Sequence, residues 1–473
     1  MRTRKRPNGG DVMSVLAAFA VPHPPIILPE VGHGEERKIQ KTIDAYRAVM
    51  RRAAELHPET IVLTSPHTVM YADYFHISPG AGAEGDFGQF GAPQVRVKAE
   101  YDTEFVESLS KLCGEQRIPA GTFGERNKSL DHATMIPLRF LSEFAVGCRV
   151  VRIGLSGLSP LTHYRLGQCI ARTAEKLNRR VVFIASGDLS HKLKDDGPYG
   201  FAPEGPEFDR LTTEALGNGD FLKLLELDPD LCESAAECGL RSFWIMSGAL
   251  DRKAVQSRLL SYEGPFGVGY GVAAFEVTGE EKTRDIGEQL QNAEHKRLAE
   301  QKAGEDPFVR LARLSLETYV KTGNYAELPD SLPDEMMKKR AGAFVSLKKN
   351  GSLRGCIGTF EPTQGSVAEE ILRNAVSAAA HDPRFDPVTE DELPELVYSV
   401  DVLSRPEPID SPEQLDVRRY GVIVQNGARR GLLLPDLAGV DTPEKQIAIA
   451  REKADIGPDE PVRLWRFEAV RHQ

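Results

Sequence analysis

Short apolar runs alternate with longer amphipathic stretches over the first part of the chain. Segments 36–56 and 162–177 carry apolar residues at every third or fourth position, which is the spacing of a helix with one buried face. A third apolar helix is predicted over residues 242–250. The apolar runs predict buried strands at residues 15–20, 60–63, 149–153 and 181–185. This alternation predicts an α/β domain with a central sheet and flanking helices.

The last third of the chain shows a different pattern, with two hairpin signals. Asn-Gly pairs lie between apolar runs at residues 350–351 and 426–427. Such a pair predicts a tight hairpin turn, because both central residues must adopt a positive φ. Helices are predicted over residues 308–321 and 367–380, and a strand over residues 396–403. These elements predict a smaller α+β domain.

A compositional break separates the two patterns. Residues 279–305 contain almost no large apolar side chains, so this segment cannot bury enough surface to form a core. We interpret it as a charged and partly helical linker. The predicted organisation is therefore a first domain at residues 12–278, a linker at 279–306 and a second domain at 307–470.

Composition narrows the class of protein. Of the 473 residues, 59 are Lys or Arg and 70 are Asp or Glu, which leaves a net charge of −11. This acidic balance argues against nucleic-acid binding, which needs a clustered basic surface. No run reaches the ~18 apolar residues that a membrane-spanning helix needs, and the run at residues 14–20 lacks a signal-peptide cleavage site. The cysteines are scattered without a CxxC pair, so we expect reduced thiols and a cytoplasmic location.

Three histidines come shortly after predicted strands. His23, His67 and His191 follow the first, second and fourth of the strand candidates. Ligands of open α/β sheets bind beyond the carboxyl ends of the strands, where the loops converge, so these imidazoles are candidates for one site. Each of them alone could equally be a loop histidine that packs against its neighbours. The glycine-rich stretch at residues 78–94 predicts a loop that is mobile or covers the site.

Two imidazoles and one carboxylate on one face of an octahedral ion leave three positions open. That arrangement suits non-haem Fe(II) that binds both a substrate and O₂. The carboxylate candidate is Glu237, which precedes the helix predicted at 242–250. The other interpretation of Glu237 is an acidic residue near a helix N-terminus, where the helix dipole stabilises it. Two histidines and one glutamate with an open position also suit a zinc hydrolase.

Motifs around these candidates carry a family resemblance. They are PHPP around His23, SPH at His67, DHATMIPL around His132, SGDLSH at His191, and Glu237 ahead of its helix. Together they make residues 12–277 resemble the class III extradiol ring-cleavage dioxygenases of the LigB-like superfamily, which also contains the Memo proteins. The resemblance implies that His23, His67 and Glu237 are Fe(2+) ligands. It also implies that His191 is the catalytic acid/base, that His132 is a pocket residue, and that a small catechol-like diol reacts with O₂.

The chain departs from this pattern at the third ligand. Memo-like relatives place a cysteine with their histidines in a Cys-Gly context, and here Glu237 directly precedes Cys238 and Gly239. A carboxylate favours Fe(II) dioxygenase chemistry, whereas a thiolate favours softer or redox-active metal chemistry. Our leading prediction is Glu237 and an extradiol dioxygenase. The alternative is a Memo-like redox or modification protein without ring cleavage, in which Cys238 is a ligand or redox residue and the metal is Zn, Cu or Mn.

The second domain carries its own motif, LRGCIG at residues 353–358, followed by the helix segment EEILRNA. On these residues it resembles the AMMECR-type domain. Arg354 beside Cys356 could lower the pKa of the thiol, and the other interpretation is a buried strand cysteine that acts as a small hydrophobe. Fusions of the two domain types resemble a bacterial system that includes a radical-SAM protein, which implies such a partner. The sequence leaves open whether the chain forms a homo-oligomer.

Overall fold

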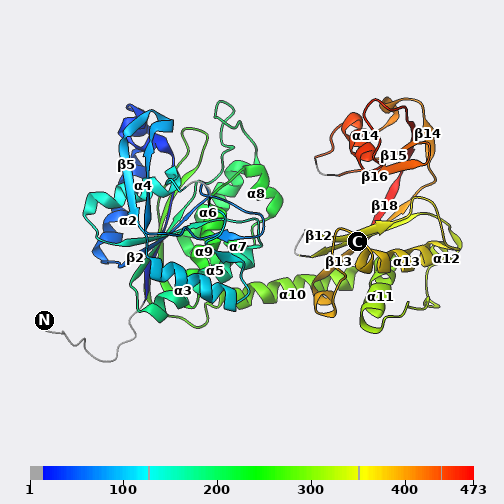
Figure 1. Cartoon of the computed structure of the whole chain (residues 1–473), viewed down its shortest axis with the longest axis horizontal. Coiled ribbons are helices and arrows are strands. Elements are labelled where there is room, and N and C mark those ends of the chain that lie inside the picture. Colours follow the sequence, from blue (N-terminus) through cyan, green and yellow to red (C-terminus); the bar gives the residue numbers. More distant parts are fainter. Residues whose placement is uncertain (1–13, 126–127, 350–351, 438) are drawn as a thin grey trace. The chain divides into compact units, whose positions relative to one another are not determined.

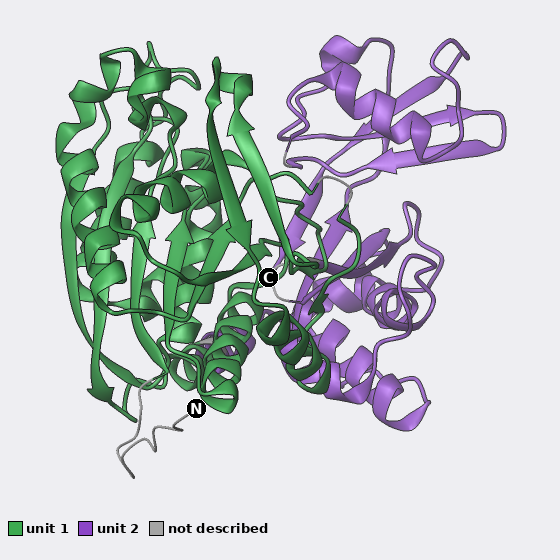
Figure 2. Ribbon diagram, turned by 60° about the vertical axis from the view of Figure 1, so that its left-hand side comes forward, with its two compact units in different colours: residues 1–293 green, residues 294–473 purple. Residues whose placement is uncertain are grey.

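The computed structural model describes residues 14–125, 128–349, 352–437 and 439–473. It divides into two compact units, residues 1–293 and 294–473 (Figure 2), and each is described by itself. Within the described residues, no helix combines the length and the apolar character that crossing a bilayer requires.

The first unit, coloured blue to green in Figure 1, is built on a six-stranded sheet with strand order β7-β2-β8-β1-β10-β9. Four neighbouring strands are parallel: β7 (Arg149–Gly154), β2 (Thr60–Ser65), β8 (Val181–Ser186) and β1 (Val15–Val21). Two antiparallel strands extend the sheet, β10 (Tyr270–Glu280) and β9 (Lys253–Glu263). The parallel strands are the four that the apolar runs predict, so the α/β prediction is confirmed.

Helices cover both faces of this sheet. One face packs against α2 (Gln40–Glu55) and α4 (His132–Leu141), and the other against α3 (Thr103–Glu115), α5 (Pro160–Leu177), α6 (Glu204–Asn218) and α9 (Leu240–Ala249). Successive side chains of a strand point to opposite faces, so Ile61 and Leu63 join one core and Val62 joins the other. Burying each such side chain contributes roughly 1.5–3 kcal/mol, which makes the two cores the main source of stability.

Shorter elements complete the unit: α1 (Pro29–Gly32), β3 (Phe75–His76), β6 (Ala120–Gly121), α7 (Phe221–Leu225) and α8 (Pro229–Ala235). The prediction of a loop at residues 78–94 is wrong for much of this segment. There β4 (Gly82–Phe87) pairs with β5 (Ala92–Glu100) in an antiparallel hairpin. Alternating burial from Val95 to Glu100 is the signal of this strand, and the high glycine content of its partner obscured the pairing.

The second unit contains two four-stranded sheets. The first has the order β12 (Ser352–Gly358), β11 (Ala343–Lys349), β13 (Leu396–Leu403) and β18 (Ala469–His472), and the second β14 (Glu407–Ile409), β17 (Arg463–Phe467), β15 (Gly421–Asn426) and β16 (Arg429–Leu433). Its helices are α11 (Pro307–Thr322), α12 (Asp334–Lys338), α13 (Val367–Ala380) and α14 (Pro443–Glu452). Both predicted hairpins pair as antiparallel strands, although the turn at 350–351 lies outside the described residues.

The segment predicted as a linker contains one long helix, α10 (Ile286–Gly304). The division between the two units falls within this helix. Its side chains are mostly polar, and its first turns contribute to a core: Ile286 is buried in the first unit, and Leu290 packs against the same core.

Candidate metal centre and adjoining cavity

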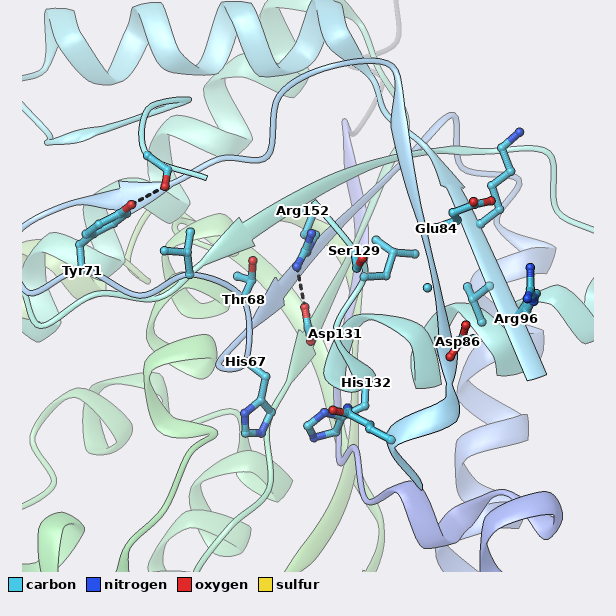
Figure 3. Close-up of a pocket in the computed structure, with 17 residues that line it drawn as sticks. His67, Thr68, Tyr71, Glu84, Asp86, Arg96, Ser129, Asp131, His132 and Arg152 are labelled. Atoms are coloured by element: carbon cyan, nitrogen blue, oxygen red, sulfur yellow. Dashed lines mark hydrogen bonds and ion pairs between the residues drawn. The ribbon is translucent and has the colours of Figure 1, made fainter. Parts of the chain in front are cut away.

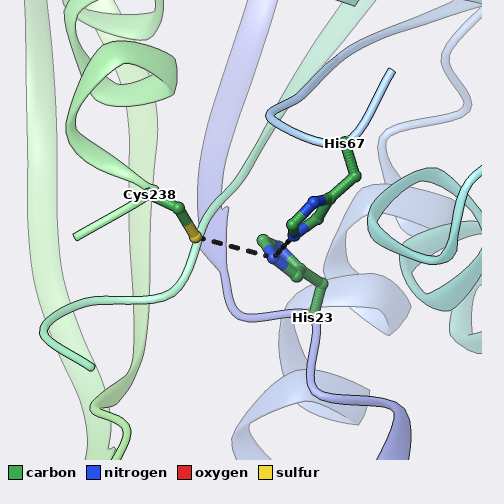
Figure 4. Close-up of side chains that lie close together, drawn as sticks. All are labelled: His23, His67 and Cys238. Carbon is green, nitrogen blue, oxygen red and sulfur yellow. Dashed lines mark hydrogen bonds between the residues drawn. The ribbon is translucent and has the colours of Figure 1, made fainter. Parts of the chain in front are cut away.

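Two histidines and a cysteine converge at the carboxyl end of the sheet (Figure 4). His23 follows β1, His67 follows β2, and Cys238 lies just before α9. The two imidazole Nε2 atoms are 3.1 Å apart, and the thiol Sγ is 3.7 Å from Nε2 of His23. The three ligand atoms all lie within 4.8 Å of one another, so they could hold one metal ion.

Hydrogen bonds fix the His23 ring in one tautomer. Its Nδ1 lies 3.1 Å from Oγ of Ser186, and that hydroxyl donates to the carbonyl of Ala133 at 2.7 Å. Because the hydroxyl proton is used, Nδ1–H of His23 donates to Ser186, and Nε2 keeps its lone pair. A ring nitrogen directed in this way is the usual state of a metal-ligating histidine.

Backbone contacts place the thiol of Cys238. The backbone N–H of Asp188 donates to Sγ at 3.3 Å, and the N–H of Cys238 approaches the Asp188 carbonyl at 3.4 Å. The two loops can come this close because a Cβ on Gly187 would overlap the Cα of Gly239. Glycine at these positions therefore permits the approach of Cys238 to the histidines.

Burial keeps His23 and Cys238 neutral in the absence of a cation. Burial, and next the proximity of His67, lower the pKa of His23 well below its usual value, so its lone pair is free near neutral pH. Burial, followed by Asp188, raises the pKa of the Cys238 thiol well above its usual value. A bound cation deprotonates a coordinating thiol, so this donor set fits a metal that accepts two imidazoles and one thiolate.

Glu237 lies next to this group but faces elsewhere. Its Oε2 accepts a hydrogen bond from the backbone N–H of Leu240 at 2.6 Å, and its Oε1 lies 3.9 Å from Arg241. Burial raises the pKa of this carboxyl group. Among the residues that the structure describes, no group of three potential ligands includes Glu237. The geometry thus brings the alternative ligand candidate, Cys238, to the histidines and places Glu237 at the N-terminus of α9, as in the other interpretation of this residue.

His191 belongs to a second, overlapping group with Asp188 and Cys238. Its ring packs edge-on against Tyr199, with centroids 5.1 Å apart. Burial raises the pKa of Asp188 to about 6, so this carboxyl group titrates near neutral pH in the absence of a metal. The structure therefore places His191 beside the three-residue group but outside it.

His132 is the first residue of α4, and its ring lies 4.3 Å from that of His67. Burial, and next the proximity of His23, lower the pKa of His132 to about 3. Its imidazole is therefore neutral at physiological pH. It can accept a hydrogen bond from a bound molecule, but its low pKa makes it a weak proton acceptor.

A cavity of about 1100 Å³ opens beside His67 and His132 (Figure 3). Its lining also includes the charged residues Glu84, Asp86, Arg96, Lys98, Asp131 and Arg152. The sequence interpretation missed Asp131 and Arg152 as site residues. Arg152 stands in the middle of an apolar strand and is 2 % exposed. Its position was an available signal, because a buried arginine needs carboxylate partners.

The candidate residues of the second unit are engaged in local contacts. Both hydrogen bonds of the Arg354 guanidinium to Glu392 measure 2.9 Å. The thiol of Cys356 accepts a hydrogen bond from Ser346 Oγ at 3.2 Å, and its backbone N–H donates to Asp382. Arg354 thus pairs with a carboxylate, and the role of Cys356 stays a prediction.

Comparisons with known proteins identify both units. Residues 17–273 match the family model described as the catalytic LigB subunit of aromatic ring-opening dioxygenase, and residues 309–472 match AMMECR1. A protein of Clostridium acetobutylicum is 41% identical over 98% of this chain and 100% of its own length. A Thermotoga maritima protein is 52% identical over 36% of this chain and 99% of its own length.

Two solved structures are also similar. An uncharacterized protein of Pyrococcus horikoshii has 36% sequence identity and a TM-score of 0.33, and covers 35% of this chain and 88% of its own. An uncharacterized protein of Escherichia coli K12 has 15% identity and a TM-score of 0.37, and covers 55% of this chain and 99% of its own.

Proposed function

We propose that the first unit of this chain, which belongs to the LigB family, is a metal-dependent redox enzyme. The C-terminal part of the chain matches AMMECR1. The metal ligands of the first unit would be His23, His67 and Cys238. The observation that carries this proposal is the mutual approach of their ligand atoms within 4.8 Å. Two imidazoles and a thiolate suit copper, zinc or iron, and a redox role favours copper or iron.

The bound metal would supply a position where a substrate and O₂ meet and exchange electrons. Residues of the chain would do the rest. The cavity beside His67 and His132 is large enough for a small organic substrate and lies next to the ligand group. His191, outside the three-residue group, would accept a proton from the substrate and return it later in the reaction.

A second candidate is an Fe(II)-dependent extradiol dioxygenase that cleaves a catechol-like ring. Its support is the LigB family itself, which is described by aromatic ring opening. Fe(II) in this role would take a carboxylate ligand. Glu237 would have to release the N–H of Leu240 to supply it, whereas Asp188 already lies within 4.8 Å of Cys238.

Metal content and oxygen consumption distinguish the two candidates. Cys238→Ser and Glu237→Gln would be purified beside the wild type and analysed for bound metal. On the first proposal, Cys238→Ser loses metal and Glu237→Gln retains it. The reverse result contradicts the proposed ligand set and favours the dioxygenase. An oxygen-electrode screen with catechols after anaerobic Fe(II) loading adds the decisive measurement, because catechol-dependent uptake with loss of the ring chromophore would establish ring cleavage.

A further inference from the structure

The carboxylate of Asp131 receives hydrogen bonds from three different elements. Ser65 Oγ at the end of β2 donates at 2.6 Å, and Nη2 of Arg152 in β7 donates at 2.9 Å. Thr134 of α4 donates twice, from its backbone N–H at 3.0 Å and from its hydroxyl at 2.8 Å. Burial alone would raise the pKa of Asp131, but Arg152 and these donors hold it below its usual value. Asp131 is therefore ionised, and its four hydrogen bonds hold both carboxylate oxygens in place.

Three of these four bonds lead to histidines of the site. Oγ of Ser65 also accepts the backbone N–H of His67 at 3.2 Å. The bonds to Thr134 cap α4, whose first residue is His132. Figure 3 shows Asp131 between Arg152 and the two imidazole rings. One carboxylate thus connects the loop that carries His67 with the helix that carries His132.

We propose that Asp131 is a positioning residue that fixes His67 and His132 relative to each other, with Arg152 holding its carboxylate in place. The importance of the two rings rests on the proposed function, whereas the positioning itself follows from the contacts. Removing an outer partner of a metal ligand typically weakens metal binding by about 10–100-fold. Asp131 reaches His67 through the hydroxyl of Ser65, one hydrogen bond farther away than a direct outer partner. We therefore expect the lower end of this range.

The chain offers a matched control in Asp102. This carboxylate also caps a helix, α3, through the N–H of Phe105, and also accepts a hydroxyl of β2, Thr60 Oγ1, at 2.6 Å. It too lies beside an arginine, Arg179, at 3.4 Å. Asp102 is therefore a similar helix-capping carboxylate with fewer hydrogen bonds, at the other end of β2 and away from the histidines.

The test compares Asp131→Asn with Asp102→Asn in the full chain. An asparagine side chain accepts hydrogen bonds through one oxygen only, and its NH₂ group cannot accept where the second carboxylate oxygen did. Each variant therefore loses the hydrogen bonds that one carboxylate oxygen accepted. Two quantities are measured: the ring ¹H–¹³C signals of His67 and His132, assigned with His→Gln variants, and the Co²⁺ affinity. Asp131→Asn should shift both ring signals and weaken Co²⁺ binding about tenfold, and Asp102→Asn should change neither.

A second variant covers the case in which Asp131→Asn does not fold. Ser65→Ala removes only the hydroxyl that joins Asp131 to the loop, so it should shift the His67 signal and leave that of His132 in place. The proposal is overturned if Asp131→Asn, or Ser65→Ala in its stead, leaves the His67 signal at its wild-type position, or if Asp102→Asn shifts the rings equally. If wild-type protein binds no Co²⁺, the proposed function is contradicted, and the ring signals alone decide the role of Asp131.

Discussion

At the scale of residues, the backbone conformation determines which of two adjacent side chains, Glu237 or Cys238, lies beside the histidines. Cys238 and Glu237 are neighbours in sequence, yet the thiol faces His23 while the carboxylate caps α9. The sequence predicted that His23, His67 and His191 lie at a common edge, because parallel strands end there; the structure brings His23 and His67 together with Cys238 and places His191 beside them. The sequence favoured Glu237 over Cys238 as the third ligand, because the direction of a side chain before a helix depends on the folded loop and cannot be read from the local pattern.

His191 is expected to act on protons without holding the metal. His191→Ala should therefore retain wild-type metal content while turnover falls by about 10²–10⁴-fold, the usual contribution of a positioned acid/base. Elemental analysis beside oxygen consumption measures both quantities. Loss of metal from this variant would instead make His191 a ligand.

Asp209 gives the first unit a predicted pH dependence of stability. It is 1 % exposed and accepts hydrogen bonds from Ser190 N–H and Tyr262 Oη, and burial raises its pKa to about 7. Because the folded state binds this proton more tightly than the unfolded state, its stabilising contribution is complete below the usual carboxyl pKa and is lost as the pH rises to about 7. Asp209→Asn should reduce the difference between urea midpoints at pH 5 and pH 8. An unchanged difference would show that Asp209 does not cause it.

At the scale of elements, the apolar runs predicted the four parallel strands, because strands buried on both faces are continuously apolar. The antiparallel strands β9 and β10 and the β4–β5 hairpin were not predicted. Their residues alternate in exposure or contain glycine, and their pairing depends on partners that the local pattern does not specify. Asp131 and Arg152 were missed because their pairing joins the start of α4 to a strand 21 residues later, which the local pattern does not specify.

The contact between the loop of Gly187 and the loop that carries Cys238 and Gly239 leads to a prediction at this scale. Gly187→Ala should force the Cys238 loop away from His23, because its Cβ would overlap the backbone of Gly239. We expect metal affinity to fall at least as far as for loss of an outer partner, about 10-fold or more. Gly147→Ala is the control, since a Cβ there meets no atom within 4 Å. Equal metal affinities in the two variants would contradict the role of this contact.

At the scale of the whole molecule, the two units are expected to fold independently. Each has its own hydrophobic core, and the division falls in the polar helix α10. The fragment of residues 1–293 should bind metal with the affinity of the full chain, and the fragment 294–473 should melt cooperatively without metal. Calorimetry and metal titration of both fragments check this. A fragment that is unfolded alone would show that the units depend on each other.

The strand order also has a consequence for the timing of biosynthesis. β8 lies between β1 and β2, although both precede it by more than a hundred residues in the chain. During translation the loops that carry His23 and His67 emerge early, but the strand that separates and aligns them arrives late, and Cys238 later still. A nascent chain therefore exposes no complete ligand set until most of the first unit has left the ribosome. With the proposed ligand set, we therefore expect metal to bind only when the first unit is nearly complete.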